Sequence, residues 1–366
     1  MSKIFRAIGL MSGTSLDGID LALIESDGHE HIKIISNDYL EYNNEFRDRI
    51  RDLIFKNPTL EGIKKIENEI TILHANLVNN FLKKNNLNAG DIDLIGFHGQ
   101  TIFHQPRKKI TWQIGNSQLL ALMTGIKTVG DFRVRDVLEG GQGAPLVPIY
   151  HFYLFAKLSK PSVILNVGGV ANLTYIDNDL KNLQAFDTCF GNAPSNDLMH
   201  KKFQKEFDEN GDLAKSGKIN LELINKILEH KIFNQTLPKS FSRNDFDEAL
   251  ASLQKLEPQD ILACYSQIFA EVLARDINLF SQKPKQIIVC GGGAKNKNLL
   301  EILQKKLSDI KILTANDVGF NIDSIEAEAF AFLAIRRILN LPISFKKTTG
   351  TLNLAGSIGG VIYESL

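Results

Sequence analysis

Short stretches of glycine and hydroxyl residues follow apolar, strand-like segments, and such stretches are suited to bind phosphate. The first runs from Gly13 to Asp20 and is followed by a second apolar segment. Glycines let backbone N–H groups approach an anion closely because no Cβ intervenes, and Thr14 and Ser15 add hydroxyl donors. Carboxylates would repel bare phosphate, but Asp17 and Asp20 suit a divalent cation bound beside it. The residues indicate a cradle for a metal–nucleotide complex, although Asp-Gly is also a common hairpin turn.

Two further glycine clusters have related surroundings. Gly168 and Gly169 lie between two apolar segments, in the same strand–turn–strand layout as the first stretch. The cluster Gly291, Gly292 and Gly293 follows an apolar strand and precedes a helical segment. The repeated layout favours phosphate binding by both turns, because a turn that forms for local reasons alone gives no reason to expect a second copy.

Composition excludes several classes of protein. The chain has 366 residues, 43% hydrophobic and 23% charged, with no net charge, so no basic field points to nucleic acid or to a membrane surface. Its longest late apolar run, 329–335, is too short to span a membrane. The 3 cysteines form no CxxC pair, which argues against structural zinc and suits a reducing, cytoplasmic location.

Strands that alternate with helices predict an α/β fold in two domains. The strongest break is the Gly- and Pro-rich stretch 140–145, so we expect an N-terminal lobe over 1–137 and a C-terminal lobe over 138–340. The tail 341–366 is able to return to the first lobe. The first lobe carries the first glycine turn, and the second carries the other two glycine clusters and Asp187.

Two α/β halves that each offer a glycine hairpin resemble the superfamily of actin and the hexokinases. This resemblance implies a two-domain actin-like ATPase (ribonuclease H-like) fold with an interdomain nucleotide cleft. Within that superfamily, nine motifs that span nearly the whole chain resemble those of the anhydro-N-acetylmuramic acid kinases. They are IGLMSGTSLDGID (8–20), HGQTIFHQP (98–106), QIGNSQLLA (113–121), DFRVRD (131–136), GGQGAPLVP (140–148), NVGGVANLT (166–174), FDT (186–188), CGGGAKN (290–296) and IEAEAFAFLA (325–334).

The resemblance implies an enzyme of cell-wall (peptidoglycan) recycling that uses ATP and Mg²⁺. Water opens the anhydro bridge of 1,6-anhydro-N-acetylmuramic acid at C1, and the freed O6 takes the γ-phosphoryl to give N-acetylmuramic acid 6-phosphate. Its small-molecule partners would be the sugar and ATP. The resemblance leaves open whether the chain forms a homodimer.

Family resemblance assigns Asp187 as the general base, because the reaction needs a carboxylate that takes a proton from the attacking water. Spacing alone favours a helix cap at this position. The expected ATP-binding residues are Gly13, Thr14, Ser15, Leu16, Asp17, Gly18, Ile19, Asp20, Gly168, Gly169, Gly291, Gly292 and Gly293, with Asp17 and Asp20 on the metal directly or through water.

The expected sugar-binding residues are His98, Gln100, Arg133, Asn192 and Glu326. A guanidinium can bind the lactate carboxylate of the sugar in bidentate fashion, but Arg133 could equally pair with Asp131 or Asp136. Glu326 could bind the sugar or serve the N-terminus of the last helix. His98 has no partner at a metal-ligand spacing, so a polar lining of the sugar site is favoured over a metal.

The chain departs from the family pattern at two places on the sugar side. Relatives usually read Asp-Thr-Gly-Pro-Gly-Asn where this chain has Cys189 and Phe190 in place of Gly and Pro, and they read Thr-Gly where it has Phe241 and Ser242. Substrate identity is therefore less fixed than ATP binding. The alternatives are a kinase of another 1,6-anhydro-sugar, such as levoglucosan, and a non-enzymatic ATP-driven clamp.

Overall fold

The computed structural model describes residues 3–13, 16–56 and 58–365, and the chain forms two compact units. Unit 1 comprises residues 1–156 and 324–366, and unit 2 comprises residues 157–323. The expected boundary at 137/138 thus differs from the observed one at 156/157. The last long helix, which we expected in the second lobe, lies in unit 1.

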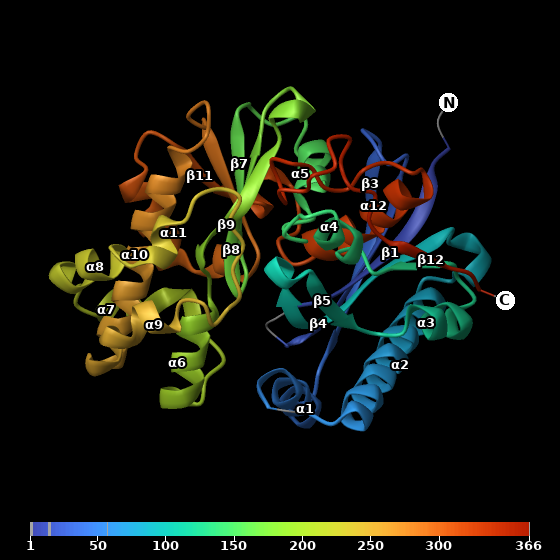
Figure 1. The fold of residues 1–366 in the computed structure, drawn as a ribbon, viewed down its shortest axis with the longest axis horizontal. Helices are drawn as coiled ribbons and strands as arrows, with labels where there is room; N and C mark the ends of the chain where they lie inside the picture. Colours follow the sequence, from blue (N-terminus) through green and yellow to red (C-terminus); the bar gives the residue numbers. More distant parts are fainter. Residues whose placement is uncertain (1–2, 14–15, 57, 366) are drawn as a thin grey trace. The chain divides into compact units, whose positions relative to one another are not determined.

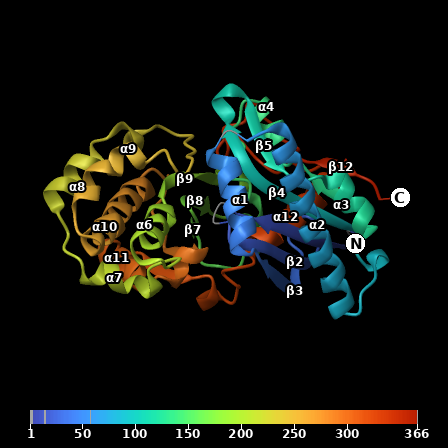
Figure 2. The ribbon, with the colours of Figure 1, turned by 90° about the horizontal axis from the view of Figure 1, so that it is seen from below.

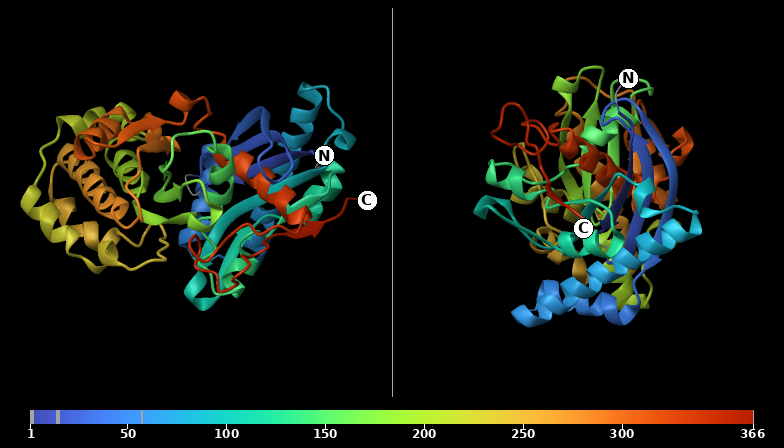
Figure 3. Two further views of the ribbon diagram at one scale, coloured as in Figure 1. Left: turned by 90° about the horizontal axis from the view of Figure 1, so that it is seen from above. Right: turned by 90° about the vertical axis from the view of Figure 1, so that its right-hand side faces the viewer.

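Unit 1 is built on a mixed sheet whose strand order is β12-β6-β4-β1-β2-β3, with β5 paired to β4 (Figure 1). Its strands are β1 (Phe5–Ser12), β2 (Gly18–Ser26), β3 (Ile32–Glu41), β4 (Leu94–Gln105), β5 (Ile110–Ile114), β6 (Thr128–Gly130) and β12 (Val361–Tyr363). Its helices are α1 (Asn44–Phe55), α2 (Leu60–Lys84), α3 (Ser117–Thr124), α4 (Val134–Leu138), α5 (Pro148–Leu154) and α12 (Ile325–Ile338). The C-terminal strand β12 pairs antiparallel with β6, so the end of the chain forms an edge strand of this sheet (Figure 3).

The two faces of this sheet are covered by helices that pack in different ways. On one face, Ile8 and Leu10 of β1 join a core to which α2 contributes its apolar stripe, including Ile70 and Phe81. On the other face, Gly9 of β1 lies opposite Gly96 of β4, and a Cβ on either glycine would collide with the backbone of α12. The paired glycines therefore let α12 pack at backbone distance, which its many alanines permit.

Unit 2 repeats the same topology with its own strands. The order is β11-β10-β7-β8-β9, in which β7, β8 and β9 form an antiparallel meander and β10 and β11 add in parallel. The strands are β7 (Ser162–Val167), β8 (Val170–Ile176), β9 (Gln184–Phe190), β10 (Gln286–Cys290) and β11 (Lys311–Thr314). In unit 1, β1, β2, β3, β4 and β6 have the same order and the same directions. Two copies of this ribonuclease H-like arrangement confirm the predicted α/β fold class.

The helices of unit 2 pack around one long central helix, α10 (Pro258–Ile277) (Figure 2). The others are α6 (Ala193–Phe203), α7 (Asp212–Ser216), α8 (Leu221–Leu228), α9 (Asp247–Leu250) and α11 (Lys297–Lys306). Buried apolar side chains of α10, such as Ile268 and Leu273, lie in the core, and the helix contacts β9 directly. Among the helices in the described part of the chain, none combines the length and apolar character that a membrane span requires.

Candidate active site

The first glycine turn joins β1 to β2 in unit 1. Two of its residues, Thr14 and Ser15, lie outside the described residues. The amide N–H of Leu16 donates to the carbonyl of Gly13 at 3.3 Å, and Leu16 has a φ of 59°. The side chains of Leu16 and Ile19 are buried in the core of unit 1. Of the residues expected to bind ATP, these two can therefore offer only backbone groups.

A cluster of buried polar side chains stabilises this turn through hydrogen bonds. The hydroxyl of Ser12 donates to Oε1 of Gln100 at 2.6 Å and therefore accepts from the Tyr42 hydroxyl at 2.9 Å. Nε2 of Gln100 donates to the carbonyl of Gly13 at 3.2 Å. Gln100 is fully buried, and both ends of its amide serve the turn. This geometry favours a role for Gln100 in shaping the first glycine turn over the direct sugar contact that the sequence suggested. Neither Ser12 nor Tyr42 was singled out from the sequence.

Asp17 immediately precedes β2 and Asp20 lies within it, and both are close enough to Tyr39 for their charges to act on its phenol. Burial raises the pKa of Tyr39, and the negative charges of Asp17 and Asp20 raise it further. Asp17 is exposed and Asp20 is half-buried. Carboxylate oxygens are the ligands that Mg²⁺ prefers, and this ion commonly keeps several waters and few protein ligands. These two residues therefore fit a magnesium ion held beside phosphate.

A second glycine turn, in unit 2, is joined to neighbouring segments by hydrogen bonds. The amide N–H groups of Gly191 and Asn192 donate to the carbonyls of Gly169 and Gly168, at 2.9 and 2.7 Å. The side-chain amide of Asn192 donates to the carbonyl of Val167 at 3.1 Å. Asn192, expected on the sugar, thus also braces the turn.

The third glycine cluster packs against the same turn. A Cβ on Gly293 would lie 2.4 Å from the side chain of Val167, and one on Gly291, whose φ is +72°, would lie 2.5 Å from Oδ1 of Asn166. A Cβ on Gly292 would lie 3.3 Å from the side-chain amide of Asn192. Unit 2 therefore brings together the second and third clusters, which are far apart in sequence.

Packing explains some of the glycines expected at ATP and leaves Gly168 unexplained. Gly18, Gly291 and Gly293 are required by packing, because a Cβ on Gly18 would lie 2.3 Å from the carbonyl of Leu40 and the other two collide as described. Packing does not explain Gly168, since among the described residues its Cβ would find nothing closer than the carbonyl of Val170 at 3.6 Å. Gly168 is thus a position where a ligand can explain the absent side chain.

Asp187 lies in the middle of strand β9. The residue is buried, at 7% exposure, and its carboxylate accepts a hydrogen bond from the amide of Phe241 at 2.9 Å. Its own amide donates to the carbonyl of Lys239 at 3.1 Å. Helix α6 begins at Ala193 with Asn192 as its N-cap residue. Asp187 is therefore not the cap of this helix, which removes the simpler interpretation of its position.

The two departures from the family pattern meet in one aromatic cluster. The rings of Phe190 and Phe241 both pack edge-on against Phe246, with centroid distances of 5.6 and 5.0 Å. Phe190 also contacts Tyr265 of α10 at 5.6 Å. The bulk that each departure adds is thus buried beside Asp187 in a shared core.

Arg133 and His98 form a second candidate group, in unit 1. Nδ1 of His98 donates to the carbonyl of Gly99 at 2.8 Å, and its Nε2 accepts from Nε of Arg133 at 3.0 Å. The ring is therefore neutral, and burial together with the Arg133 charge lowers its pKa well below the ordinary value. The guanidinium also donates to the carbonyl of Gly143 at 2.7 Å.

The carboxylates considered as alternative partners of Arg133 have roles of their own. Asp131 accepts from the hydroxyl of Tyr363 at 2.7 Å. Asp136 is buried and accepts from the amide of Gly143 and the hydroxyl of Thr349, at 2.7 and 2.6 Å. Within the described residues, no cluster of three His, Cys, Asp or Glu side chains could hold a metal ion. Glu326 is half-buried in the first turn of α12, which leaves both of its interpretations open.

The duplicated topology and the glycine turns define an actin-like, ribonuclease H-like ATPase fold. Residues 5–364 match the family model described as anhydro-N-acetylmuramic acid kinase. The chain belongs to this family.

Curated relatives have the same name. The anhydro-N-acetylmuramic acid kinase of Zymomonas mobilis is 41% identical over 353 residues, which cover 94% of this chain and 96% of that protein. The protein of that name from Methylorubrum populi is 40% identical over 382 residues, which cover 98% and 99%. Among solved structures, component A of the Acidaminococcus fermentans (R)-2-hydroxyglutaryl-CoA dehydratase aligns with a TM-score of 0.47 and 13% identity, over 92% of this chain and 99% of that one.

Proposed function

We propose that this protein is a kinase that opens 1,6-anhydro-N-acetylmuramic acid with water and transfers the γ-phosphoryl of ATP to its O6. The product is N-acetylmuramic acid 6-phosphate, an intermediate of cell-wall recycling. The observation that carries the proposal is the buried Asp187 carboxylate, fixed by the amide of Phe241 in a chain of this family. We place the reaction in the cytoplasm, where the buried free thiols Cys189, Cys264 and Cys290 stay reduced.

Asp187 would act as the general base. It takes a proton from a water molecule whose oxygen attacks C1 of the sugar. The bond between C1 and O6 then breaks, its electron pair goes to O6, and O6 attacks the γ-phosphorus as ADP leaves. A positioned base contributes about 10²- to 10⁴-fold to such a step.

The glycine turns would bind the phosphates. Backbone amides of the Gly13–Asp20 turn and of Gly168 and Gly169 supply donors, and Gly292 leaves room for the nucleotide. Asp17 and Asp20 would hold Mg²⁺ directly or through water, and the ion neutralises phosphate charge. Phosphoryl transfer depends mainly on such positioning and charge neutralisation.

Arg133 would bind the carboxylate of the sugar, because its guanidinium is held at one edge by His98 and at one nitrogen by Gly143. A guanidinium oriented in advance loses less side-chain entropy when it binds a carboxylate. Glu326 and Asn192 remain candidates for the sugar's polar groups.

The test is ATP consumption by the purified protein with a panel of anhydro-sugars, in parallel with the Asp187→Asn variant. The proposal expects turnover with the muramic sugar and its near loss in the variant. Turnover with neutral levoglucosan while the muramic sugar is left untouched would instead establish the sister activity. ATP consumption without transfer to any sugar would contradict the proposal.

A further inference from the structure

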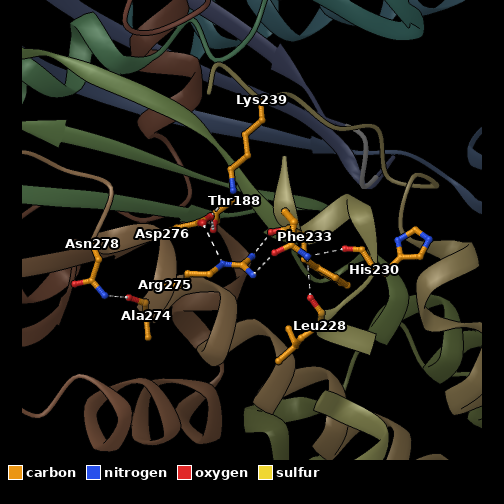
Figure 4. A network of polar contacts seen from close by, with 10 residues as sticks. Thr188, Leu228, His230, Phe233, Lys239, Ala274, Arg275, Asp276 and Asn278 are labelled. Atoms are coloured by element: carbon orange, nitrogen blue, oxygen red, sulfur yellow. Dashed lines mark hydrogen bonds and ion pairs between the residues drawn. The ribbon is translucent and has the colours of Figure 1, made fainter. Parts of the chain in front are cut away.

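Lys239 and Asp276 form a buried ion pair in unit 2 (Figure 4). Nζ of Lys239 lies 2.6 Å from Oδ2 of Asp276, and the two side chains are 1% and 2% exposed. The hydroxyl of Thr188 donates to the same oxygen at 2.6 Å. A buried ion pair is often no more stabilising than apolar residues of the same volume. The role of this ion pair therefore follows from the groups that it holds in place.

The backbone of Lys239 connects this ion pair to Asp187 through a hydrogen bond. Its carbonyl accepts from the amide of Asp187 at 3.1 Å. Two residues further on, the amide of Phe241 donates to the Asp187 carboxylate at 2.9 Å. Segment 239–241 thus bonds Asp187 at both its main chain and its carboxylate.

Both ends of this segment are anchored. At one end, the Lys239 ammonium reaches α10 through Asp276, and it also lies 5.3 Å from the ring of Phe186, the neighbour of Asp187. At the other end, the Phe241 ring is 8% exposed and packs on Phe246. Because segment 239–241 belongs to no helix or strand, these anchors replace the hydrogen-bond ladder that would otherwise fix it.

We propose that Lys239 is a positioning residue for Asp187: its ion pair with Asp276 fixes segment 239–241 so that the Phe241 amide orients the Asp187 carboxylate. The inference rests on the proposed role of Asp187 as the base. The hydrogen bond also stabilises the ionised form of the carboxylate, which is the form that accepts a proton.

Other charged and titratable groups near the pair are Arg275 and Cys189. Nε of Arg275 lies 3.9 Å from Oδ1 of Asp276, and its guanidinium donates to the carbonyl of Phe233 and to Oδ1 of Asn234. Cys189 is buried, and its thiol has a raised pKa through burial and then through the Asp276 charge. Arg275 therefore faces the same carboxylate but holds a different segment, which makes it a matched control.

The test compares Lys239→Met with Arg275→Met by steady-state kinetics and by the pH dependence of kcat/KM. For Lys239→Met we expect a kcat about 10- to 100-fold lower, as for the loss of one hydrogen bond to a charged group, with KM for ATP within about twofold. The acid limb of its kcat/KM profile moves to higher pH, because the carboxylate of the base loses its donor. Arg275→Met keeps both the kcat and the acid limb of the wild type.

Lys239→Met leaves Asp276 without its buried partner, so it could fail to fold. The double variant Lys239→Met/Asp276→Asn removes both charges and keeps an oxygen for Thr188. We expect it to fold and still to have the low kcat and the shifted acid limb. Wild-type kcat and pH profile in the folded double variant would overturn the positioning role. An Asp187→Asn variant that keeps full activity would instead overturn the base assignment, so the two failures are distinguishable.

Discussion

Nε of Arg133 donates to Nε2 of His98 at 3.0 Å, although both side chains are bases. The pair is compatible because His98 keeps its proton on Nδ1 for the carbonyl of Gly99, which leaves Nε2 as an acceptor. A neutral imidazole thus orients a guanidinium without neutralising it. The proposed role of Arg133 in binding the carboxylate of the sugar depends on this charge.

Arg133→Ala should therefore raise KM for the muramic sugar about 10- to 100-fold, because an ionic hydrogen-bond pair is lost. The same change should leave KM for a neutral anhydro-sugar within about twofold. His98→Phe keeps the ring that packs on Phe330 but removes the acceptor, so it should raise KM for the muramic sugar by a smaller factor. Equal losses on acidic and neutral sugars would contradict carboxylate recognition.

Gln100→Ala should weaken ATP binding rather than sugar binding. The amide of Gln100 bonds Ser12 and the carbonyl of Gly13 at the first turn. Losing one or two such bonds, at about 1 kcal/mol each, should raise KM for ATP about 5- to 30-fold. Gln113→Ala is the control, because the side-chain amide of Gln113 donates to the hydroxyls of Thr101 in β4 and Thr111 in β5 and not to the glycine turn. A rise confined to KM for the sugar would restore the original assignment of Gln100.

Alanine substitutions can separate ligand-facing glycines from packing glycines in unit 2. Gly168→Ala should leave the melting temperature nearly unchanged, because among the described residues its Cβ meets nothing closer than 3.6 Å. The change should raise KM for ATP about tenfold or more, since the Cβ enters the space assigned to nucleotide. Gly293→Ala is the contrast and should lower the melting temperature, because its Cβ would lie 2.4 Å from Val167. Unchanged ATP kinetics in Gly168→Ala would place the phosphates elsewhere.

Acid should destabilise unit 1 through its buried histidines. Burial lowers the pKa of His74 to about 4, and Nε2 of this ring has no hydrogen-bond partner within the described residues. Below the unfolded pKa of about 6.5, the unfolded chain binds a proton that the folded unit does not, so stability falls as the pH falls towards 4. Between pH 6.5 and 5, this histidine alone should cost about 2 kcal/mol of unfolding free energy.

The measurement is urea unfolding at pH 7 and pH 5, followed by fluorescence of Trp112, the single tryptophan of the chain, which lies in unit 1. His74→Leu should lose less stability than the wild type between these two pH values. An identical pH dependence in the two proteins would show that His74 is not the group responsible.

Those parts of the fold that depend on residues close together in the chain could be predicted from the sequence. Gly168 and Gly169 could be identified from sequence because a hairpin turn and its flanking strands are adjacent in the chain. The membership of α12 in unit 1 could not be, because it depends on Gly9 and Gly96, which are more than two hundred residues away in sequence and meet the helix only in the folded sheet.

The candidate site shows the same division. Asp187 was identified through a family resemblance, but its partners Lys239 and Phe241 lie in an irregular segment whose position depends on Asp276 of a later helix. The spacing of apolar residues in the sequence does not predict such a contact. Gln100 was expected on the sugar, while its actual partners Ser12 and Gly13 follow from the parallel pairing of β1 and β4.

The central claim is that Asp187 is the base of an ATP-dependent transfer to the muramic sugar. Its most direct test is the rate of formation of N-acetylmuramic acid 6-phosphate by the wild type and by Asp187→Asn, with KM for ATP measured in both. We predict product with the wild type, a kcat at least about 100-fold lower in the variant, and a KM for ATP within about twofold. A variant with kcat within about fivefold of the wild type, or a wild type that forms no sugar phosphate, would contradict the account.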